Sequence, residues 1–211
     1  MDFALSLVFS YFLGCIPFAY LIGRLKGVDI RTVGDRNVGA FNVCRHVGLA
    51  AGASTLAADI GKGALAIVVT KALSGGGLIV FLAGGAVVVG DIWPVFLRFR
   101  GGRGVATTVG VLLILLPRET SITLGLAGIS LLITRHSIWC GAMLFVPVPL
   151  LCLLFGETHL LLAYSMAVPC LSGAAHWIST RHLHSEAQRE SKRFWIALEG
   201  SHERQNSNKI R

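Results

Sequence analysis

Two glycine-rich segments contain arginine in patterns suited to binding a phosphate. The first spans residues 34–45 and reads GDRNVGAFNVCR. Glycine and asparagine reach backbone angles that let successive N–H groups converge on an anion, and arginine can grip a phosphate through two parallel hydrogen bonds. The candidate residues are Gly34, Asn37, Gly39, Asn42 and Arg45. From spacing alone, an anion site and a solvated turn with topology-setting charge are about equally good interpretations.

The second segment spans residues 101–108 and reads GGRGVATT. A glycine-rich turn here leads directly into an apolar run, so free backbone N–H groups and the positive end of a helix should lie beside an arginine. The candidate phosphate-binding residues are Gly101, Gly102, Arg103, Gly104 and Thr107. The spacing is not that of a P-loop. We favour an anion site over a flexible turn with topology-setting arginines, because three glycines surround the single charge.

Asp59 and Lys62 interrupt an apolar run and are three residues apart. On a helix they share one face and can pair, and ionisable groups at membrane depth are usually paired or functional. We interpret them as a structural pair that supports the neighbouring loops. Asp91, just before Trp93-Pro94, is a comparable case. Metal-ligand spacings and the HExxH and GxSxG motifs are absent from the sequence, so no metal or other cofactor is expected.

The composition places these residues in a membrane protein. Charged residues make up only 14% of the chain, hydrophobic residues 54%, and the mean hydropathy is +0.68. A soluble domain carries about 25% charged residues. The expected fold class is all-α, a polytopic membrane protein with about seven transmembrane helices. The apolar runs span residues 3–23, 49–73, 78–97, 105–117, 121–134, 138–155 and 159–178.

Two of these runs, 105–117 and 121–134, are too short for ordinary spans. They are either short tilted helices or one re-entrant pair. The predicted organisation is an integral membrane domain over residues 1–180, followed by a polar tail over 181–211.

The distribution of positive charge predicts the orientation. Arginine and lysine concentrate in the loops at 24–48 and 98–104 and in the tail, and the formal net charge is +8. The positive-inside rule makes that side cytoplasmic, so the charge needs no nucleic-acid partner and suits anionic lipids instead. We therefore expect a multi-pass membrane protein with both basic loops and the tail in the cytoplasm.

Several motifs occur in one order along the first half of the chain. They are GCIPFAYLIG at 14–23, DIR at 29–31, NVGAFNVCR at 37–45, DIGKG at 59–63 and GRGVAT at 102–107. Together they resemble the bacterial acyl-phosphate:glycerol-3-phosphate acyltransferase family. The resemblance implies a seven-helix inner-membrane enzyme. It would transfer an acyl group from acyl phosphate to the 1-hydroxyl of glycerol 3-phosphate, giving lysophosphatidic acid for phospholipid synthesis.

This chain differs from the family's usual motifs at several positions. Asp35-Arg36 replaces Ser-Gly, Phe41 replaces Thr, and Arg103 replaces Lys. The family's C-terminal His-Arg-Glu-Asn is QRES here, at 188–191. An inactive lipid- or phosphate-binding relative and a small membrane transporter therefore remain alternatives, and the oligomeric state is left open.

The resemblance and the residue patterns lead to one set of expected roles. Arg45 and Arg103 should bind phosphate and converge on one anion, and the 34–42 loop should cradle a phosphate or oxyanion. Asn37 and Asn42 should orient either the glycerol hydroxyls or the loop itself. Because phosphate is already a good leaving group, positioning and charge stabilisation can replace a protein nucleophile.

Overall fold

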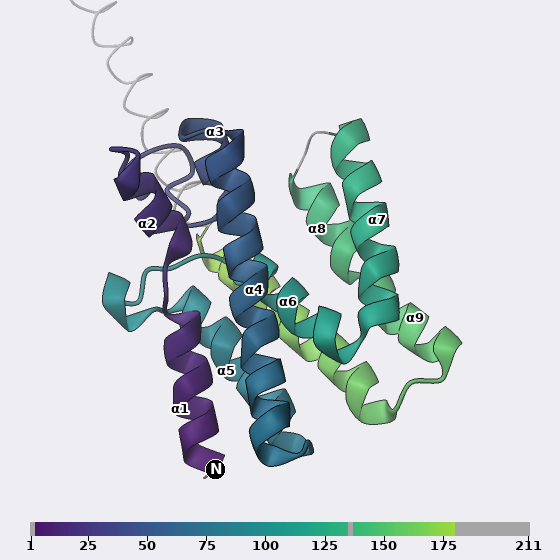
Figure 1. The fold of residues 1–211 in the computed structure, drawn as a ribbon. Helices are drawn as coiled ribbons and strands as arrows, with labels where there is room; N and C mark the ends of the chain where they lie inside the picture. The colour runs from purple at the N-terminus through teal and green to yellow at the C-terminus, as the bar shows by residue number, and fades with distance from the viewer. Residues whose placement is uncertain (1–2, 135–136, 180–211) are drawn as a thin grey trace, which may run out of the picture. The chain divides into compact units, whose positions relative to one another are not determined.

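The computed structural model describes residues 3–134 and 137–179, and its described residues up to Ala175 form one compact unit. Every regular element among these residues is a helix, which confirms the all-α class (Figure 1). In chain order, the labelled helices are α1 (Phe3–Gly14), α2 (Phe18–Leu25), α3 (Ala40–His46), α4 (Leu49–Ser74), α5 (Leu78–Ile92), η1 (Val95–Leu97), α6 (Val105–Leu115), α7 (Pro117–Thr134), α8 (Ser137–Phe145) and α9 (Pro147–Phe155).

The distribution of side chains is that of a membrane protein. Large apolar residues such as Leu132 and Leu154 are 81% and 69% exposed, whereas serine and threonine side chains are buried between helices. Three helical segments of the described chain are long and apolar enough to cross a bilayer: Phe3–Leu25, Leu78–Leu97 and His159–Ser179. The chain is therefore an integral membrane protein. The number of seven spans stays a prediction, and the tail at 181–211 lies outside the described residues.

The first apolar run is two helices, because Pro17 interrupts it. Proline lacks an N–H and disfavours helical angles at the preceding residue, so α1 ends at Gly14 and α2 begins at Phe18. The same effect ends α5 at Ile92, two residues before Pro94. Both breaks leave backbone carbonyls without helical partners. These carbonyls accept hydrogen bonds from Lys62, Gly101 and Gly102, as described below.

Small residues bring two pairs of helices into close contact. A Cβ at Gly110 of α6 would collide with the carbonyl of Ile60 in α4. A Cβ at Gly14 of α1 would collide in the same way with the carbonyl of Val87 in α5. In lipid, helices associate largely through such close packing of small residues. The first contact packs α6 closely on α4, and the second packs α1 closely on α5.

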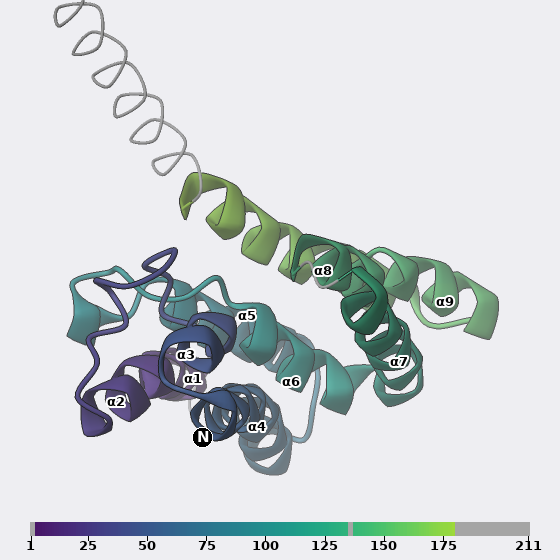
Figure 2. The ribbon, with the colours of Figure 1, turned by 90° about the horizontal axis from the view of Figure 1, so that it is seen from above.

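The loop between α2 and α3 lies against the connection from α5 to α6. Figure 2 looks down on α2 and α3 and shows these two segments side by side. A Cβ at Gly102 would lie only 2.6 Å from the carbonyl oxygen of Val38. The prediction that both basic loops occupy the same side of the helices is therefore confirmed.

Candidate active site

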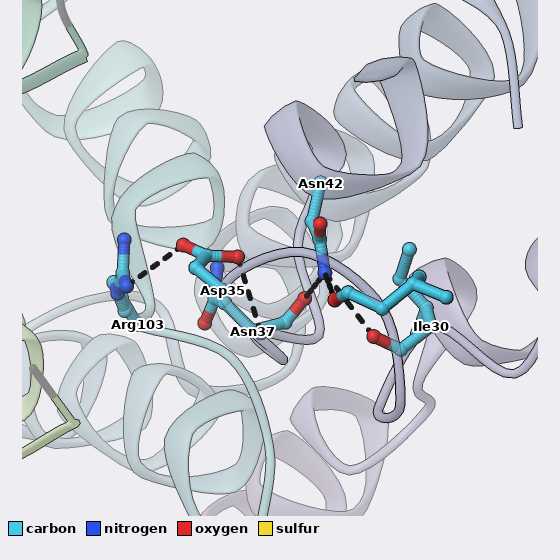
Figure 3. Close-up of polar contacts among 6 residues, drawn as sticks. Ile30, Asp35, Asn37, Asn42 and Arg103 are labelled. Atoms are coloured by element: carbon cyan, nitrogen blue, oxygen red, sulfur yellow. Dashed lines mark hydrogen bonds and ion pairs between the residues drawn. The ribbon is translucent and has the colours of Figure 1, made fainter. Parts of the chain in front are cut away.

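The first loop is held in shape by Asn42. Its side-chain amide lies 3.0–3.1 Å from three loop carbonyls, those of Ile30, Val33 and Asn37, and the residue is 97% buried (Figure 3). Asn42 sits in the first turn of α3, whose N-cap is Gly39. Of the two roles expected for Asn42, the structure supports the orientation of the loop itself.

A charged pair stiffens the start of the same loop. Asp29 accepts hydrogen bonds from the side chain of Arg31 at 2.8 and 3.0 Å. These bonds are the main cause that lowers the pKa of Asp29 to about 2. The Arg31 guanidinium also lies over the ring of Tyr20, 4.5 Å from its centroid. Arg31 is therefore the counter-charge of Asp29. Arg103 of the second loop pairs with a different carboxylate, that of Asp35.

The predicted glycines differ in what their backbones can offer a ligand. Gly34 has a φ of +58°, and a Cβ there would collide with Asn42 and His46, so the turn requires glycine. The N–H of Gly39 donates to the carbonyl of Asn37 at 3.0 Å. Contrary to expectation, the Gly39 N–H is thus committed within the loop. Gly39 contributes to the site as the N-cap residue of α3.

The same correction applies to the second loop. The N–H groups of Gly101 and Gly102 donate to the carbonyls of Ile92 and Asp91, both at 3.1 Å. The chain folds back onto the end of α5 because Pro94 leaves those carbonyls unpaired, so the two glycine N–H groups are not directed at an anion. Free backbone donors instead begin with α6, whose first N–H groups have no partner within the helix.

Arg103 forms the link between the two loops. Its Nη2 donates to Oδ2 of Asp35 at 2.9 Å, and the side chains are 14% and 37% exposed (Figure 3). The other carboxylate oxygen, Oδ1, accepts the backbone N–H of Asn37 at 3.3 Å. Sequence reasoning quoted Asp35 without giving it a role. A signal was present, since a carboxylate within a strongly basic loop needs a cation nearby.

Two buried donors at the start of α6 have no hydrogen-bond partner among the described residues. They are Nε of Arg103 and the hydroxyl of Thr107, whose side chain is fully buried. Buried polar groups are nearly always satisfied, so each of these two donors has room for a ligand or water partner. Seven other buried polar atoms among the described residues are also unpaired, so this feature alone does not single out a ligand site. Gly104 caps this helix with a φ of +75°, which places the loop and the helix start together. Arg103 and Thr107 lie four residues apart, and their joint role in binding phosphate stays a prediction.

Arg45 occupies the last turn of α3 and is exposed. It lies on the same loop-and-helix unit as Asp35, which is the counter-charge of Arg103. The convergence of Arg45 and Arg103 on one anion stays a prediction. Asn37 contributes its backbone to this unit through the N–H bonded to Asp35 and the carbonyl bonded to Asn42.

Below the loops lies a buried charge cluster centred on Lys62. Its Nζ is 2.9 Å from Oδ1 of Asp59, which confirms the predicted pair, and 2.5 Å from Oδ1 of Asp91. It also donates to the carbonyl of Ile16 at 3.0 Å, one of the groups freed by the Pro17 break. The cluster joins α4, α5 and the α1–α2 junction. Buried charges are tolerated only when paired in this way.

A cavity of about 10 Å³ adjoins this cluster, roughly room for one water molecule. Its lining includes Asp59, Asp91, Gly101 and Gly102. The cavity is too small for an acyl or glycerol substrate. The role of the cluster in supporting the loops stays a prediction. No group of three metal-ligating side chains occurs in the described part of the chain.

Comparison with known proteins agrees with this arrangement. A family model described as glycerol-3-phosphate acyltransferase matches residues 4–186. Glycerol-3-phosphate acyltransferase 4 of Dehalococcoides mccartyi is 41% identical over 181 residues, which cover 84% of this chain and 96% of that protein. The glycerol-3-phosphate acyltransferase of Rubrobacter xylanophilus is 38% identical over 72% of this chain and 77% of its own length.

Two crystal structures of PlsY, an integral membrane glycerol 3-phosphate acyltransferase, share the fold. The glycerol 3-phosphate form superimposes with a TM-score of 0.79 at 29% identity, covering 88% of this chain and 94% of that one. The lysophosphatidic acid form gives 0.75 at 28% identity over 88% and 93% of the two chains. By sequence along most of its length and by fold, the chain belongs to the glycerol-3-phosphate acyltransferase family.

Proposed function

We propose that this protein transfers an acyl group from acyl phosphate to the 1-hydroxyl of glycerol 3-phosphate, releasing lysophosphatidic acid and phosphate. Family membership supports the acceptor and the reaction type. The observation that carries the assignment of the site is Arg103, which joins the two basic loops through Asp35 and keeps a buried Nε without a partner among the described residues. Both substrates bring phosphate oxygens, which accept hydrogen bonds and need a cation.

The chemistry required of the protein is modest. Acyl phosphate is a mixed anhydride, and attack by the glycerol hydroxyl on its carbonyl carbon breaks the bond to a phosphate that can take up the hydroxyl proton as it leaves. Arg103 would stabilise the charge that develops on this phosphate. The first loop, kept rigid by Asn42, would hold the acceptor with Arg45 as a second cation.

Asp35 also affects how a phosphate would bind to Arg103. A phosphate dianion arriving at Arg103 meets a carboxylate already paired with it. The carboxylate is 37% exposed, so it can turn towards water when the substrate binds, and its charge then makes phosphate release easier. Asp35 thus favours turnover at the expense of affinity.

The positive charge of both loops supports a cytoplasmic location for this face in a bacterial inner-membrane protein. Acyl phosphate, being amphiphilic, would reach the site from the bilayer, whereas glycerol 3-phosphate would come from the cytosol. Single cysteines placed at positions 26 and 100 of a cysteine-free variant test this orientation. Labelling of either from the outer side of intact cells would contradict it.

The decisive experiment is acyl transfer by the purified protein in lipid nanodiscs. Palmitoyl phosphate and radiolabelled glycerol 3-phosphate should give labelled lysophosphatidic acid, and palmitoyl-CoA should not replace the acyl phosphate. If no product forms but calorimetry detects glycerol 3-phosphate binding, the protein is an inactive phosphate-binding relative. If neither occurs, the assignment of the site is wrong. Facilitated release of either phosphate compound from sealed vesicles would instead indicate a transporter.

A further inference from the structure

The connection from α5 to α6 contains a tightly folded surface segment, residues 93–100, which we call the connector. Trp93, the C-cap of α5, begins it, and η1 with its N-cap Pro94 forms its centre. Backbone hydrogen bonds close it, including Phe99 N–H to the Pro94 carbonyl at 3.0 Å and Arg100 N–H to the Leu97 carbonyl at 3.2 Å. Leu97 is buried against the core beneath the first loop. The connector is therefore an ordered structure with a defined inner side.

Its outer side combines aromatic and cationic side chains. Phe96 is 63% exposed and Phe99 is 58% exposed, and the arginines at 98 and 100 are exposed as well. Arg98 and Phe99 have φ values of 54° and 61°, a left-handed conformation that is unfavourable for residues with a Cβ. Backbone hydrogen bonds from Arg98 to the Val95 carbonyl and from Phe99 to the Pro94 carbonyl accompany this conformation. Neither the buried cluster nor the phosphate site uses these side chains.

The connector continues the lipid-facing surface of α1. The ring of Phe96 packs on the ring of Phe12, with centroids 6.3 Å apart, and Tyr11 donates its hydroxyl to the Trp93 carbonyl at 3.0 Å. Phe12 belongs to the exposed apolar face of α1, together with Leu5, Val8 and Phe9. That helix is part of a segment long and apolar enough to span a bilayer. Phe96 thus extends a surface that already faces acyl chains, and the exposed Phe99 lies three residues further along the connector.

We propose that the connector is an interfacial lipid-binding site, in which Phe96 and Phe99 insert among acyl chains while Arg98 and Arg100 bind the phosphates of anionic phospholipids. Aromatic side chains and arginine are the types that occupy this depth of a bilayer. The occupant follows from continuity with the α1 surface and from the charge of the two arginines. This binding does not depend on catalysis.

The site has a consequence for the reaction, which rests on the proposed function. Arg103 follows the connector by three residues. A connector held at the headgroup level would keep Arg103 at the depth where the phosphate of a membrane-embedded acyl phosphate lies. Anionic lipid would then affect the use of acyl phosphate more than the use of glycerol 3-phosphate.

Fluorescence quenching in nanodiscs can test the binding. The four native tryptophans are replaced by phenylalanine, and a single reporter is introduced by Phe96→Trp or, separately, by Phe99→Trp. We expect blue-shifted emission, quenching by phospholipids brominated on the acyl chain, and little quenching by aqueous iodide. Water-like emission with strong iodide quenching in both reporters would overturn the proposal, whether the connector is simply solvated or awaits a soluble partner.

The role of the arginines is tested in the same reporter protein. Brominated phosphatidylglycerol and brominated phosphatidylcholine are compared at equal mole fraction, and quenching should favour the anionic lipid. That preference should fall by about fivefold for each arginine removed in Arg98→Gln and Arg100→Gln. Arg118→Gln, which removes an exposed arginine from the start of α7, is the matched control and should leave the preference unchanged. An equal preference in all variants would refute anionic lipid binding here.

Discussion

Replacing Arg103 by lysine should preserve most of the acyl-transfer rate, whereas replacing it by alanine should nearly abolish the reaction. The side chain is only 14% exposed and carries a buried Nε without a partner, so its charge acts in a partly desolvated site. Lysine keeps the charge and several donors, although it lacks the planar fork of arginine. We expect Arg103→Lys to retain kcat within about tenfold, since a point charge suffices to stabilise a leaving phosphate.

The loss in Arg103→Ala can be estimated. Removing one preorganised donor from a transition state costs about 2–4 kcal/mol, which is roughly 10²–10³ in rate. The variant also leaves Asp35 beside the substrate phosphate without its cation. Two charges about 4 Å apart repel by ~1 kcal/mol in water and by ~4 kcal/mol at a partly buried site. Because Asp35 is 37% exposed, a value near the lower end applies.

The double variant Arg103→Ala/Asp35→Asn isolates that repulsion. It should recover roughly tenfold of the lost rate, a coupling that follows from the ion pair. Steady-state rates normalised to inserted protein measure it, with Lys26→Ala as the control, an exposed cation at the end of α2. If Lys at 103 fails as badly as Ala, a bidentate grip is indispensable. If Ala retains full activity, Arg103 is not part of the phosphate site.

Three further outcomes follow from the packing. Lys62→Met leaves two carboxylates buried without a cation and should lower the stability by about 3–5 kcal/mol, seen as a sharply lower melting temperature in detergent. Asn42→Ala deprives three loop carbonyls of their donor, so limited proteolysis should cut residues 26–39 much faster while the helices stay protected. Gly110→Val forces α6 away from α4 and should cost at least about 1–3 kcal/mol. Gly128→Ala, where nothing lies within 4 Å of the new methyl group, should be neutral in the same melting assay.

Local spacing predicted interactions within one helix but not those between helices. Asp59 and Lys62 are three residues apart, so their pairing could be inferred once the helix was recognised. The second carboxylate, Asp91, is 29 residues from Lys62, and the carbonyl of Ile16 is 46 residues away. Their meeting depends on how α1 and α5 cross α4. Interhelical geometry of this kind has no periodic signature in a single sequence.

In the glycine-rich loops, too, local backbone features could be predicted from the sequence and long-range partners could not. The glycines and asparagines of the first loop suggested left-handed backbone angles, and Gly34 has one, whereas Gly39 is extended. The glycine content could not predict that the N–H groups of Gly101 and Gly102 would turn inward, because their acceptors are carbonyls freed by a proline several residues earlier. It also could not pair Asp35 with Arg103 across 68 residues.

The sequence by itself determined the membrane environment, the all-helical class and the family, and it singled out Arg45 and Arg103 as candidates for phosphate binding. These properties depend on composition, on runs of apolar residues and on the order of short motifs, all of which are local. The tertiary structure decided which donors remain free for a ligand and which are consumed internally. A hydrogen bond or ion pair forms with whichever partner the fold brings within about 3 Å. For Arg103, Lys62 and Asn42, most of these partners lie in other segments of the chain.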